Sequence, residues 1–435
     1  MDITLSYGRR GLGVRLPDAN VRQVLRFHRL APVERPEAAV RHALRFPIGC
    51  PPLRELALGR RDACLVTSDI TRPVPNALLI SAVLSELRDG GLPPERVTIL
   101  VGTGLHRPNT PEELREMLGD EVLDSGVRVV NHVARDADGQ VHLGETPRGT
   151  PVYVDRAYVE ADLKLAVSLV EPHLMAGFSG GRKALCPGIC GMETIRRFHG
   201  PALLDPAEAC AGLLDGNPVH EESLAVAMLA GPPDLTVNVT LNESRELTGV
   251  FAGELVVCHR AAVRRSVEQS KVAIPAPVDL VVTTNAGHPL DLTFYQGVKG
   301  MIAAVPILKP GGTILIAHEC AEGIGGPEFT ALTLGLSDPH EYIRRTWDPQ
   351  VFTIDQWQLH EQVKVLRHAG EVLSVSGGVP AEQLAQCHVT PVASVEEGVE
   401  RALRKHGSDA AIAVIPEGPY VLACLEGDRI DRQRV

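Results

Sequence analysis

The alternation of short β-branched runs with amphipathic helical stretches constrains the fold of this chain most. ACLVTSD (63–69) and RVTILVGTG (96–104) each lead through a polar loop into a helical pattern, and ADLKLAVSLV (161–170) leads into a glycine-rich segment. This repetition is typical of α/β architecture with mostly parallel strands. A chain of 435 residues is also too long for one core of the usual size. We therefore expect two Rossmann-like α/β domains.

Local signals place the first helices. Asn76 is a candidate N-cap for a helix that ends at the glycines of LRDGG. In the next unit Thr110, Pro111 and Glu113 form a capping-box pattern, in which the threonine and glutamate side chains satisfy each other's backbone N–H groups. Both signals predict helices that directly follow strands.

Polar residues follow each of the three strands. Asp69 and Arg72 come after the first strand, His106 and Arg107 after the second, and His173 after the third. Ligands of open α/β sheets bind beyond the carboxyl ends of the strands. A histidine at a strand end can simply satisfy backbone groups, but two at successive strand ends, beside Asp69 and Arg72, favour catalysis. A pair of imidazoles suits general acid–base chemistry in both directions of a reversible reaction.

A second α/β pattern begins after the proline-rich boundary in KVAIPAPVDL, with a strand in DLVVTTN, a helix in FYQGVKGMIAAVPILK and a strand in TILIAH. We expect the first domain to span 1–272 and the second 273–405, and the closing residues 406–435 to return to the first domain. Gln296 and Lys299 share one face of the predicted helix, with Tyr295 beside them. They are either the polar side of an exposed helix or a clamp for a carboxylate.

Composition excludes several classes of protein. The net charge of −11 argues against nucleic-acid and anionic-membrane binding, and no apolar run reaches the length of a membrane span or of a secretory signal. Nine cysteines without a CxxC pair fit reduced thiols. We expect a cytoplasmic enzyme with a small-molecule substrate; the sequence leaves its oligomeric state open.

The segment EPHLMAGFSGGRKALCPGICGMETIRRFHG (171–200) concentrates glycines with reactive side chains. It is not a nucleotide-triphosphate loop, because Arg182 precedes Lys183 and no serine or threonine follows it. Cys186, Cys190 and His199 could ligate zinc or nickel. The C-x3-C spacing favours structural cysteines in a packed turn, whereas His199 ends a short predicted helix and can project from it.

Three further interpretations stay open on the residues alone. GTG at 102–104 begins like a dinucleotide fingerprint but lacks its third glycine. LKPGGTILIA resembles a passage of S-adenosylmethionine-dependent methyltransferases, although Pro-Gly-Gly is ordinary turn chemistry. A non-enzymatic protein that stores a nucleotide or a metal would use the same residues without turnover.

Five motifs together resemble the nickel-dependent lactate racemase family, whose members are racemases and epimerases of 2-hydroxy acids. The motifs are SDITRPVP, GTGLHRPNT, EPHLMAGFSGGRKALCPG, RFHGP and FYQGVKG, and the resemblance runs from about residue 5 to residue 420. It implies two Rossmann-like α/β domains with an active-site cleft between them. It also implies an isomerase that uses Ni in a nickel-pincer nucleotide, nickel pyridinium-3,5-bisthiocarboxylic acid mononucleotide.

The resemblance assigns the cofactor-binding residues. Lys183 is expected to be joined covalently to the cofactor through a thioamide, and His199 to be the protein ligand of the metal. Asp69 and Arg72 are expected to line the pocket for cofactor and substrate. Trp357 matches an aromatic residue that lies against the pyridinium ring. Proteins of cofactor biosynthesis and maturation are the implied partners.

The resemblance also assigns the groups that act on the substrate. His106 and His173 are expected to form the acid–base pair, and Tyr295, Gln296 and Lys299 to bind the substrate from the second domain. The implied mechanism is proton-coupled hydride transfer. Lactate or another short-chain 2-hydroxy acid is the expected substrate, with a larger 2-hydroxy acid or a sugar acid as the alternative within the family.

Overall fold

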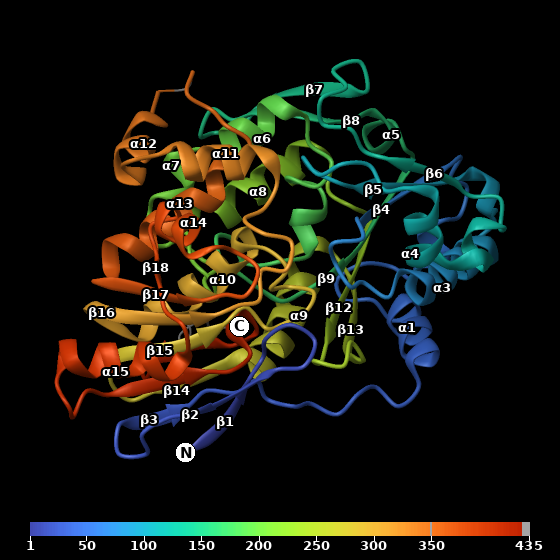
Figure 1. The fold of residues 1–435 in the computed structure, drawn as a ribbon. Coiled ribbons are helices and arrows are strands. Elements are labelled where there is room, and N and C mark those ends of the chain that lie inside the picture. Colours follow the sequence, from blue (N-terminus) through green and yellow to red (C-terminus); the bar gives the residue numbers. More distant parts are fainter. Residues whose placement is uncertain (349, 429–435) are drawn as a thin grey trace. The chain divides into compact units, whose positions relative to one another are not determined.

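The computed structural model describes residues 1–348 and 350–428, which form two compact α/β units. We call Arg29–His199 with Leu214–Gln269 the first unit, and Met1–His28, Gly200–Leu213 and the described chain from Ser270 the second unit. Each contains a six-stranded sheet with helices packed against it (Figure 1). The predicted fold class, α/β with mostly parallel sheets, is confirmed.

The sheet of the first unit has the order β13-β12-β9-β4-β5-β6, in which only β13 is antiparallel to its neighbour. The strands are β4 (Ala63–Ser68), β5 (Val97–Gly102), β6 (Arg128–Asn131), β9 (Leu163–Leu169), β12 (Leu235–Leu241) and β13 (Leu247–Gly253). Chain order runs outward from β4 to β6 and then restarts at β9 on the other side of β4. This reversal makes the carboxyl ends of β4 and β9 the switch point of the sheet, where ligands of such folds bind.

The helices of the first unit pack against this sheet, against one another or against a neighbouring hairpin or turn. They are α1 (Pro36–Arg45), α2 (Leu53–Leu56), α3 (Asn76–Asp89), α4 (Pro111–Leu123), α5 (Arg156–Val159), α6 (Met192–Phe198), α8 (Pro218–Leu229) and α9 (Leu255–Ser270). The first unit also contains two small hairpins, β7 (Gln140–Glu145) with β8 (Pro151–Asp155) and β10 (Pro172–His173) with β11 (Gly177–Phe178). In α3, Leu79, Val83 and Leu87 are completely or almost completely buried, the spacing that seats one helical face on a core.

The two helix-start signals have different outcomes. The capping box of Thr110 and Glu113 is present as predicted. Asn76 is not the N-cap: it is the first residue of α3, and its side-chain oxygen accepts a hydrogen bond from the Thr67 hydroxyl at 2.6 Å. A tertiary contact with β4 has taken the oxygen that would otherwise cap the helix.

The sheet of the second unit is entirely parallel, in the order β18-β17-β16-β15-β19-β3. Its strands are β3 (Val21–Val24), β15 (Val278–Thr284), β16 (Leu308–Ala317), β17 (Glu371–Val375), β18 (Thr390–Pro391) and β19 (Ile412–Ile415). The helices are α7 (Pro201–Leu204), α10 (Phe294–Ala304), α11 (Pro327–Gly335), α12 (Pro339–Arg345), α13 (Gln356–His368), α14 (Ala381–Gln386) and α15 (Val395–His406). The pairs β1 (Asp2–Leu5) with β2 (Leu12–Arg15) and β14 (Lys271–Ile274) with β20 (Leu422–Leu425) complete the unit.

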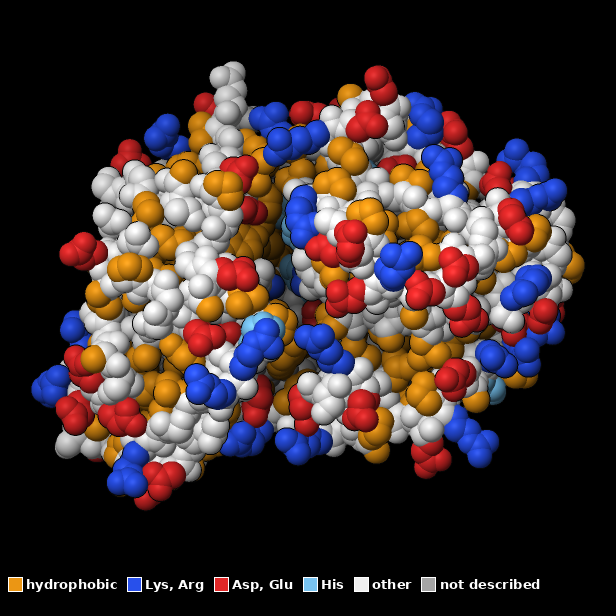
Figure 2. Space-filling view, turned by 45° about the vertical axis from the view of Figure 1, so that its right-hand side comes forward, with side chains coloured by type: hydrophobic (Ala, Val, Ile, Leu, Met, Phe, Trp, Pro, Cys, Tyr) orange, Lys and Arg blue, Asp and Glu red, His pale blue; other side chains and the backbone are white. Residues whose placement is uncertain are grey.

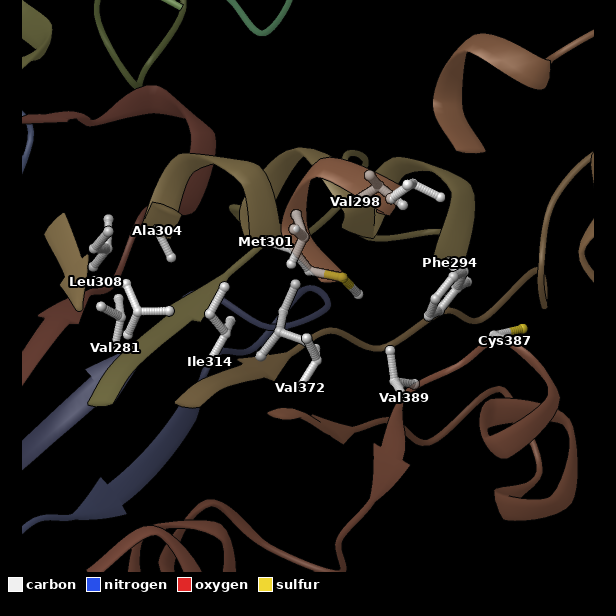
Figure 3. Packing of buried hydrophobic residues seen from close by; sticks show 14 of the residues in the cluster. Val281, Phe294, Val298, Met301, Ala304, Leu308, Ile314, Val372, Cys387 and Val389 are labelled. Atoms are coloured by element: carbon white, nitrogen blue, oxygen red, sulfur yellow. The ribbon is translucent and has the colours of Figure 1, made fainter. Parts of the chain in front are cut away.

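The core of the second unit determines which face of α10 is available for binding. Phe294, Val298 and Met301 of α10 belong to one buried hydrophobic cluster with the sheet residues Val281 and Ile314 (Figure 3). These helical positions recur with the spacing of one buried face. The partly exposed residues between them are therefore held in place by a rigid helix.

The structure differs from the expectation that residues 406–435 return to the first domain. Within the described part of that segment, β19 lies between β15 and β3 in the sheet of the second unit, and β20 pairs with β14. All four residues of β19 are buried, because a strand with parallel neighbours on both sides is covered on both faces. The N-terminal residues 1–28 join the same unit. Residues 429–435 lie outside the described residues.

The surface carries charges of both signs. Figure 2 shows lysine and arginine side chains interspersed with aspartate and glutamate over the visible face. Among the described residues, no helix is long and apolar enough to cross a membrane.

Candidate active site

His106 and Asp69 form a close pair after neighbouring parallel strands, β5 and β4. His106 Nδ1 lies 2.6 Å from Asp69 Oδ2, with the imidazole largely exposed and the carboxylate buried. Burial alone would raise the pKa of Asp69, but the hydrogen bonds from His106 and Thr71 and the charge of Arg72 outweigh it and lower that pKa. The ionised carboxylate accepts the Nδ1 proton, which leaves the lone pair of His106 on Nε2. His106 is thus arranged as a base.

Thr71 fixes the other oxygen of Asp69. Its hydroxyl donates to Asp69 Oδ1 at 2.5 Å and its backbone N–H to the same oxygen at 3.2 Å. The carboxylate therefore cannot turn away from His106 without losing both bonds. No sequence pattern indicates this role for Thr71, because an ordinary loop threonine has the same local pattern.

His173 holds its proton on the opposite nitrogen. Its Nδ1 accepts from the backbone N–H groups of Met175 and Ala176, both at 3.3 Å. An accepting Nδ1 requires the neutral ring to carry its proton on Nε2. His173 belongs to the short strand β10, directly after β9 at the switch point of the sheet. The two predicted catalytic histidines are thus in complementary states at Nε2, one an acceptor and one a donor.

Lys183 lies on a tight glycine turn at the same edge of the sheet. The 3-10 turn Gly181–Ala184 contacts β4, β9 and β12. Burial of its ammonium group, with the charges of Arg182 and Arg72 assisting, lowers the pKa of Lys183 to about 7. A large fraction of Lys183 is therefore a neutral, nucleophilic amine near pH 7.

Only glycine fits the turn that precedes Lys183. Gly180 has φ +77° and Gly181 φ +52°. A Cβ on Gly180 would lie 2.6 Å from Val170 Cγ2, and one on Gly181 would lie 2.9 Å from the His259 ring. Side chains here would strain the backbone and collide with its neighbours. The glycines of this motif thus allow the turn to pack closely against β9 and α9.

His199 is placed by the end of α6, as predicted. It is the C-cap residue, and its Nδ1 lies 3.3 Å from the Ile195 carbonyl oxygen. A proton shared with that carbonyl sits on Nδ1 and puts the lone pair on Nε2, the state required of a metal-binding imidazole. The buried Phe198 ring is near both candidate groups: the His199 ring is 5.1 Å from it and Lys183 Nζ 6.0 Å.

The cysteines of the segment are structural. Cys186 and Cys190 are fully buried, the Cys190 thiol donates to the Leu185 carbonyl at 3.3 Å, and the Cys186 carbonyl accepts from Ser223 at 2.6 Å. Among the described residues, no group of three or more His, Cys, Asp or Glu side chains could hold a metal ion.

The predicted substrate-binding residues of the second unit gather at the start of α10. Tyr295 OH accepts from Trp357 Nε1 of α13 at 3.0 Å, and the Tyr295 carbonyl accepts from Gln358 at 2.6 Å. Lys299 lies one turn farther along α10. Gln296 Oε1 is buried without a hydrogen-bond partner among the described residues. A buried carbonyl of this kind is costly unless a donor reaches it, and a substrate hydroxyl is such a donor.

Comparison with known proteins decides which family has this architecture. The family model of the lactate racemase N-terminal domain matches residues 7–211, and that of the lactate racemase C-terminal domain matches residues 273–423. The lactate racemase of Lactiplantibacillus plantarum is 34% identical over 429 residues, which cover 97% of this chain and 99% of that protein. The chain belongs to the lactate racemase family.

A second relative and the structure of its apoprotein agree with this membership in the lactate racemase family. The lactate racemase of Thermoanaerobacterium thermosaccharolyticum is 32% identical over 97% of this chain and 99% of its own. The structure of its apoprotein superposes with a TM-score of 0.91 and covers 97% of this chain and all of that one. A protein from Thermotoga maritima, 18% identical with a TM-score of 0.66, covers 90% of this chain and 98% of its own and shares the fold.

Membership in the lactate racemase family makes the chain an isomerase of the racemase type. The predicted family and enzyme class are confirmed, and they replace the methyltransferase interpretation. The passage LKPGGTILIA is accounted for as strand β16.

Proposed function

We propose that this protein racemises or epimerises a 2-hydroxy acid, lactate or a similar short-chain acid, with a nickel-pincer nucleotide tethered to Lys183. The observation that carries the proposal is that His106 and His173, which follow strands of one sheet, hold opposite protonation states at Nε2; the lowered pKa of Lys183 supports it. Relatives named lactate racemase support the choice of a 2-hydroxy acid.

Proton transfer alone is a poor route for this reaction. The carboxylate beside the α-carbon is already negative, so removing the α-proton would build further charge next to it. Moving the α-hydrogen as a hydride avoids that carbanion and passes through a planar 2-keto acid, which can be reduced on either face. When bound, the nickel-pincer nucleotide would supply the reversible acceptance of that hydride.

The protein moves the hydroxyl proton. His106 accepts it at Nε2 as the α-hydrogen leaves, and Asp69 stabilises the resulting imidazolium through the Nδ1 bond. The keto acid then turns its other face, and the re-forming hydroxyl takes a proton from His173 Nε2, which regains one from solvent as His106 releases its proton to solvent. The opposite enantiomer follows the same steps in reverse, with these proton exchanges preceding them. Arg72 and Lys299 are proposed to bind the carboxylate, and Gln296 Oε1 to accept a substrate hydrogen bond.

The residues of the first unit fit the implied cofactor. The neutral amine of Lys183 would form the thioamide with a thiocarboxyl carbon, whose C–O bond breaks with loss of water, and the glycine turn lets a planar ring approach the backbone. The imidazole of His199 has the tautomer of a metal ligand. Asp69 and Arg72 would line the pocket, and Trp357 would lie against the pyridinium ring. Cofactor-biosynthesis and maturation proteins would be required partners, in a cytoplasm that keeps the nine free cysteines reduced.

The decisive experiment is a panel of 2-hydroxy acid enantiomers, including sugar acids, assayed by chiral chromatography with protein co-produced with the cofactor-biosynthesis enzymes. We expect interconversion of a short-chain acid and one nickel per chain. Turnover of sugar acids alone would replace the short-chain substrate by the alternative within the family. Loaded protein that interconverts no 2-hydroxy acid would refute the proposed function.

The metal assignment has its own test. His199→Ala should lose bound nickel, measured by elemental analysis, while Lys183 keeps its covalent adduct in the intact mass. His142→Ala is a matched control, because His142 is stacked on Tyr153 in the β7–β8 hairpin. Nickel retained in His199→Ala at the wild-type level would show that the ligand is assigned wrongly.

A further inference from the structure

Arg182, the residue before Lys183, is the largest fully buried side chain among the described residues, at 1% exposure. In the described part of the chain it has no aspartate or glutamate within ion-pair distance. A buried arginine normally requires a carboxylate, because an unpaired charge is expensive in a protein interior. Family resemblance gave Arg182 no role, and the sequence marked it only as the residue that interrupts a phosphate loop.

The guanidinium is bound instead by backbone carbonyls and lies against one imidazole, whose Nε2 is also 2.8 Å from the Ser179 carbonyl oxygen. Nη2 donates to the Ala176 carbonyl at 2.7 Å and Nη1 to the Gly180 carbonyl at 3.4 Å. Nη1 also lies 3.0 Å from Nε2 of the buried His259 on α9. Burial lowers the pKa of His259 to about 3, so this ring is neutral. The planar fork of arginine thus joins three separate pieces of backbone and helix, which a lysine ammonium could not do in the same geometry.

The two carbonyls that Arg182 binds belong to residues that also contact His173 and Lys183. Ala176, whose carbonyl Arg182 holds, is also the residue whose N–H donates to His173 Nδ1 at 3.3 Å. Gly180, whose carbonyl Arg182 also holds, begins the turn that carries Lys183, and its carbonyl accepts from the Lys183 N–H at 3.1 Å. One side chain therefore stands between the backbone that orients the histidine and the backbone that presents the lysine.

We propose that Arg182 is a positioning residue that fixes His173 and the Lys183 turn relative to each other. The roles of His173 and Lys183 rest on the proposed function. The clamp, by which we mean the hydrogen bonds of Arg182 to the two backbone carbonyls, rests on the observed contacts. The charge of Arg182 also acts on Lys183. Burial lowers the pKa of Arg182 only to about 9, so the guanidinium stays cationic at neutral pH and favours the neutral form of the Lys183 amine.

The first test uses the apoprotein and needs no cofactor. Lys183 is labelled competitively with acetic anhydride between pH 6 and 9, and the labelled peptide is quantified by mass spectrometry against the peptide of the exposed Lys405. Arg182→Met should slow the labelling of Lys183 at neutral pH several-fold and move its midpoint upward from about 7, because one of the charges that lower its pKa is gone. Arg72 and the Cys186 thiol, the other groups that act on Lys183, remain in place.

The matched control is Arg260→Met. Arg260 follows His259 on α9 but is paired with Asp215 at the surface. Labelling of Lys183 should be unchanged in this variant. If Arg182→Met does not fold, Arg182→Lys replaces it, with a smaller effect in the same direction expected. Wild-type labelling of Lys183 in a folded Arg182 variant would overturn the proposal.

The second test uses holoenzyme and separates positioning from stability. Per covalently loaded chain, Arg182→Met should lose about tenfold or more in kcat with KM changed less than about twofold, because His173 acts on substrate that is already bound. A variant with a lower Tm but wild-type kcat per loaded chain would reduce Arg182 to a structural residue and overturn the proposal. If wild-type holoenzyme racemises nothing, the proposed function fails, while the labelling experiment still decides the clamp.

Discussion

Replacing Asp69 by asparagine tests the pairing that makes His106 a base. Thr71 donates its hydroxyl and its N–H to Oδ1, so an asparagine at this site would place its carbonyl oxygen there and turn its amide NH2 toward His106. The ring would then have to accept at Nδ1 and carry its proton on Nε2. Asp69→Asn therefore inverts the tautomer of His106 and deprives it of the lone pair that receives the substrate proton.

The expected loss follows from two contributions. A hydrogen bond to a charged group contributes about 1.5–3 kcal/mol, which corresponds to about 10- to 150-fold in rate. The wrong tautomer adds to this loss, and the same exchange in a serine protease triad costs about 10⁴-fold. We expect kcat per loaded chain to fall by about 10²- to 10⁴-fold. The assay is racemisation of the best substrate under saturation, normalised to nickel content and to covalent adduct.

Asp120→Asn is the matched control, since this exposed carboxylate is paired with Arg115 on the surface of the first unit. It should leave kcat unchanged. Asp69→Asn with kcat within about threefold of wild type, at equal loading, would refute the assignment of His106 as a base oriented by Asp69.

Three shorter predictions concern Lys183, the Tyr295–Trp357 pair and the glycine turn. The folded state holds the pKa of Lys183 at about 7, against an ordinary value of 10.5. The stability of the apoprotein should therefore fall as the pH drops from 10.5 to 7 and level off below pH 7. In urea unfolding, Lys183→Met should be more stable than wild type at pH 7, and the difference should vanish near pH 10.5. Tyr295→Phe removes the acceptor of Trp357 Nε1 and should cost about 1 kcal/mol of stability of the second unit, with a changed tryptophan emission spectrum. Gly181→Ala should destabilise by about 1–3 kcal/mol in thermal unfolding and lower covalent loading, because of its positive φ and the contact with the His259 ring.

Each of these predictions has a control. Lys405→Met changes an exposed lysine and should leave the pH dependence of stability as in wild type. Trp347→Phe identifies the emission of the other tryptophan, so an unchanged Trp357 signal in Tyr295→Phe would contradict the hydrogen bond. Gly216 has φ +82° with open space around it, so Gly216→Ala should cost only the backbone strain and less than Gly181→Ala. Equal losses at the two glycines would remove the argument for close packing at the turn.

Local patterns predicted those features that depend on neighbours in the chain. The capping box at Thr110, the helix that ends at His199, and the strands that deliver Asp69, His106 and His173 to one edge all follow from spacing and from the geometry of parallel sheets. Assigning roles to these residues required the family motifs.

Features that depend on distant partners could not be predicted. Asn76 lost its capping role to a threonine on a strand, and β19 joined a sheet with the N-terminal strand β3. Arg182 became interpretable only through His259, 77 residues further on, and through two carbonyls whose directions no pattern specifies. The proton positions on the histidines likewise depend on the directions of particular N–H groups.

The pairing of β3 with β19 has a consequence for biosynthesis. Asn20 beside β3 donates to the Ser408 carbonyl, 388 residues further on. At about 5–20 residues per second, a ribosome needs about 20–80 s to make the intervening chain. During that time the N-terminal strands have no sheet to join, whereas the residues of the first unit are already complete by Gln269. Nascent chains should therefore acquire protease resistance in the first unit well before the N-terminus does, and a stop codon before β19 should leave the N-terminal segment a target for degradation.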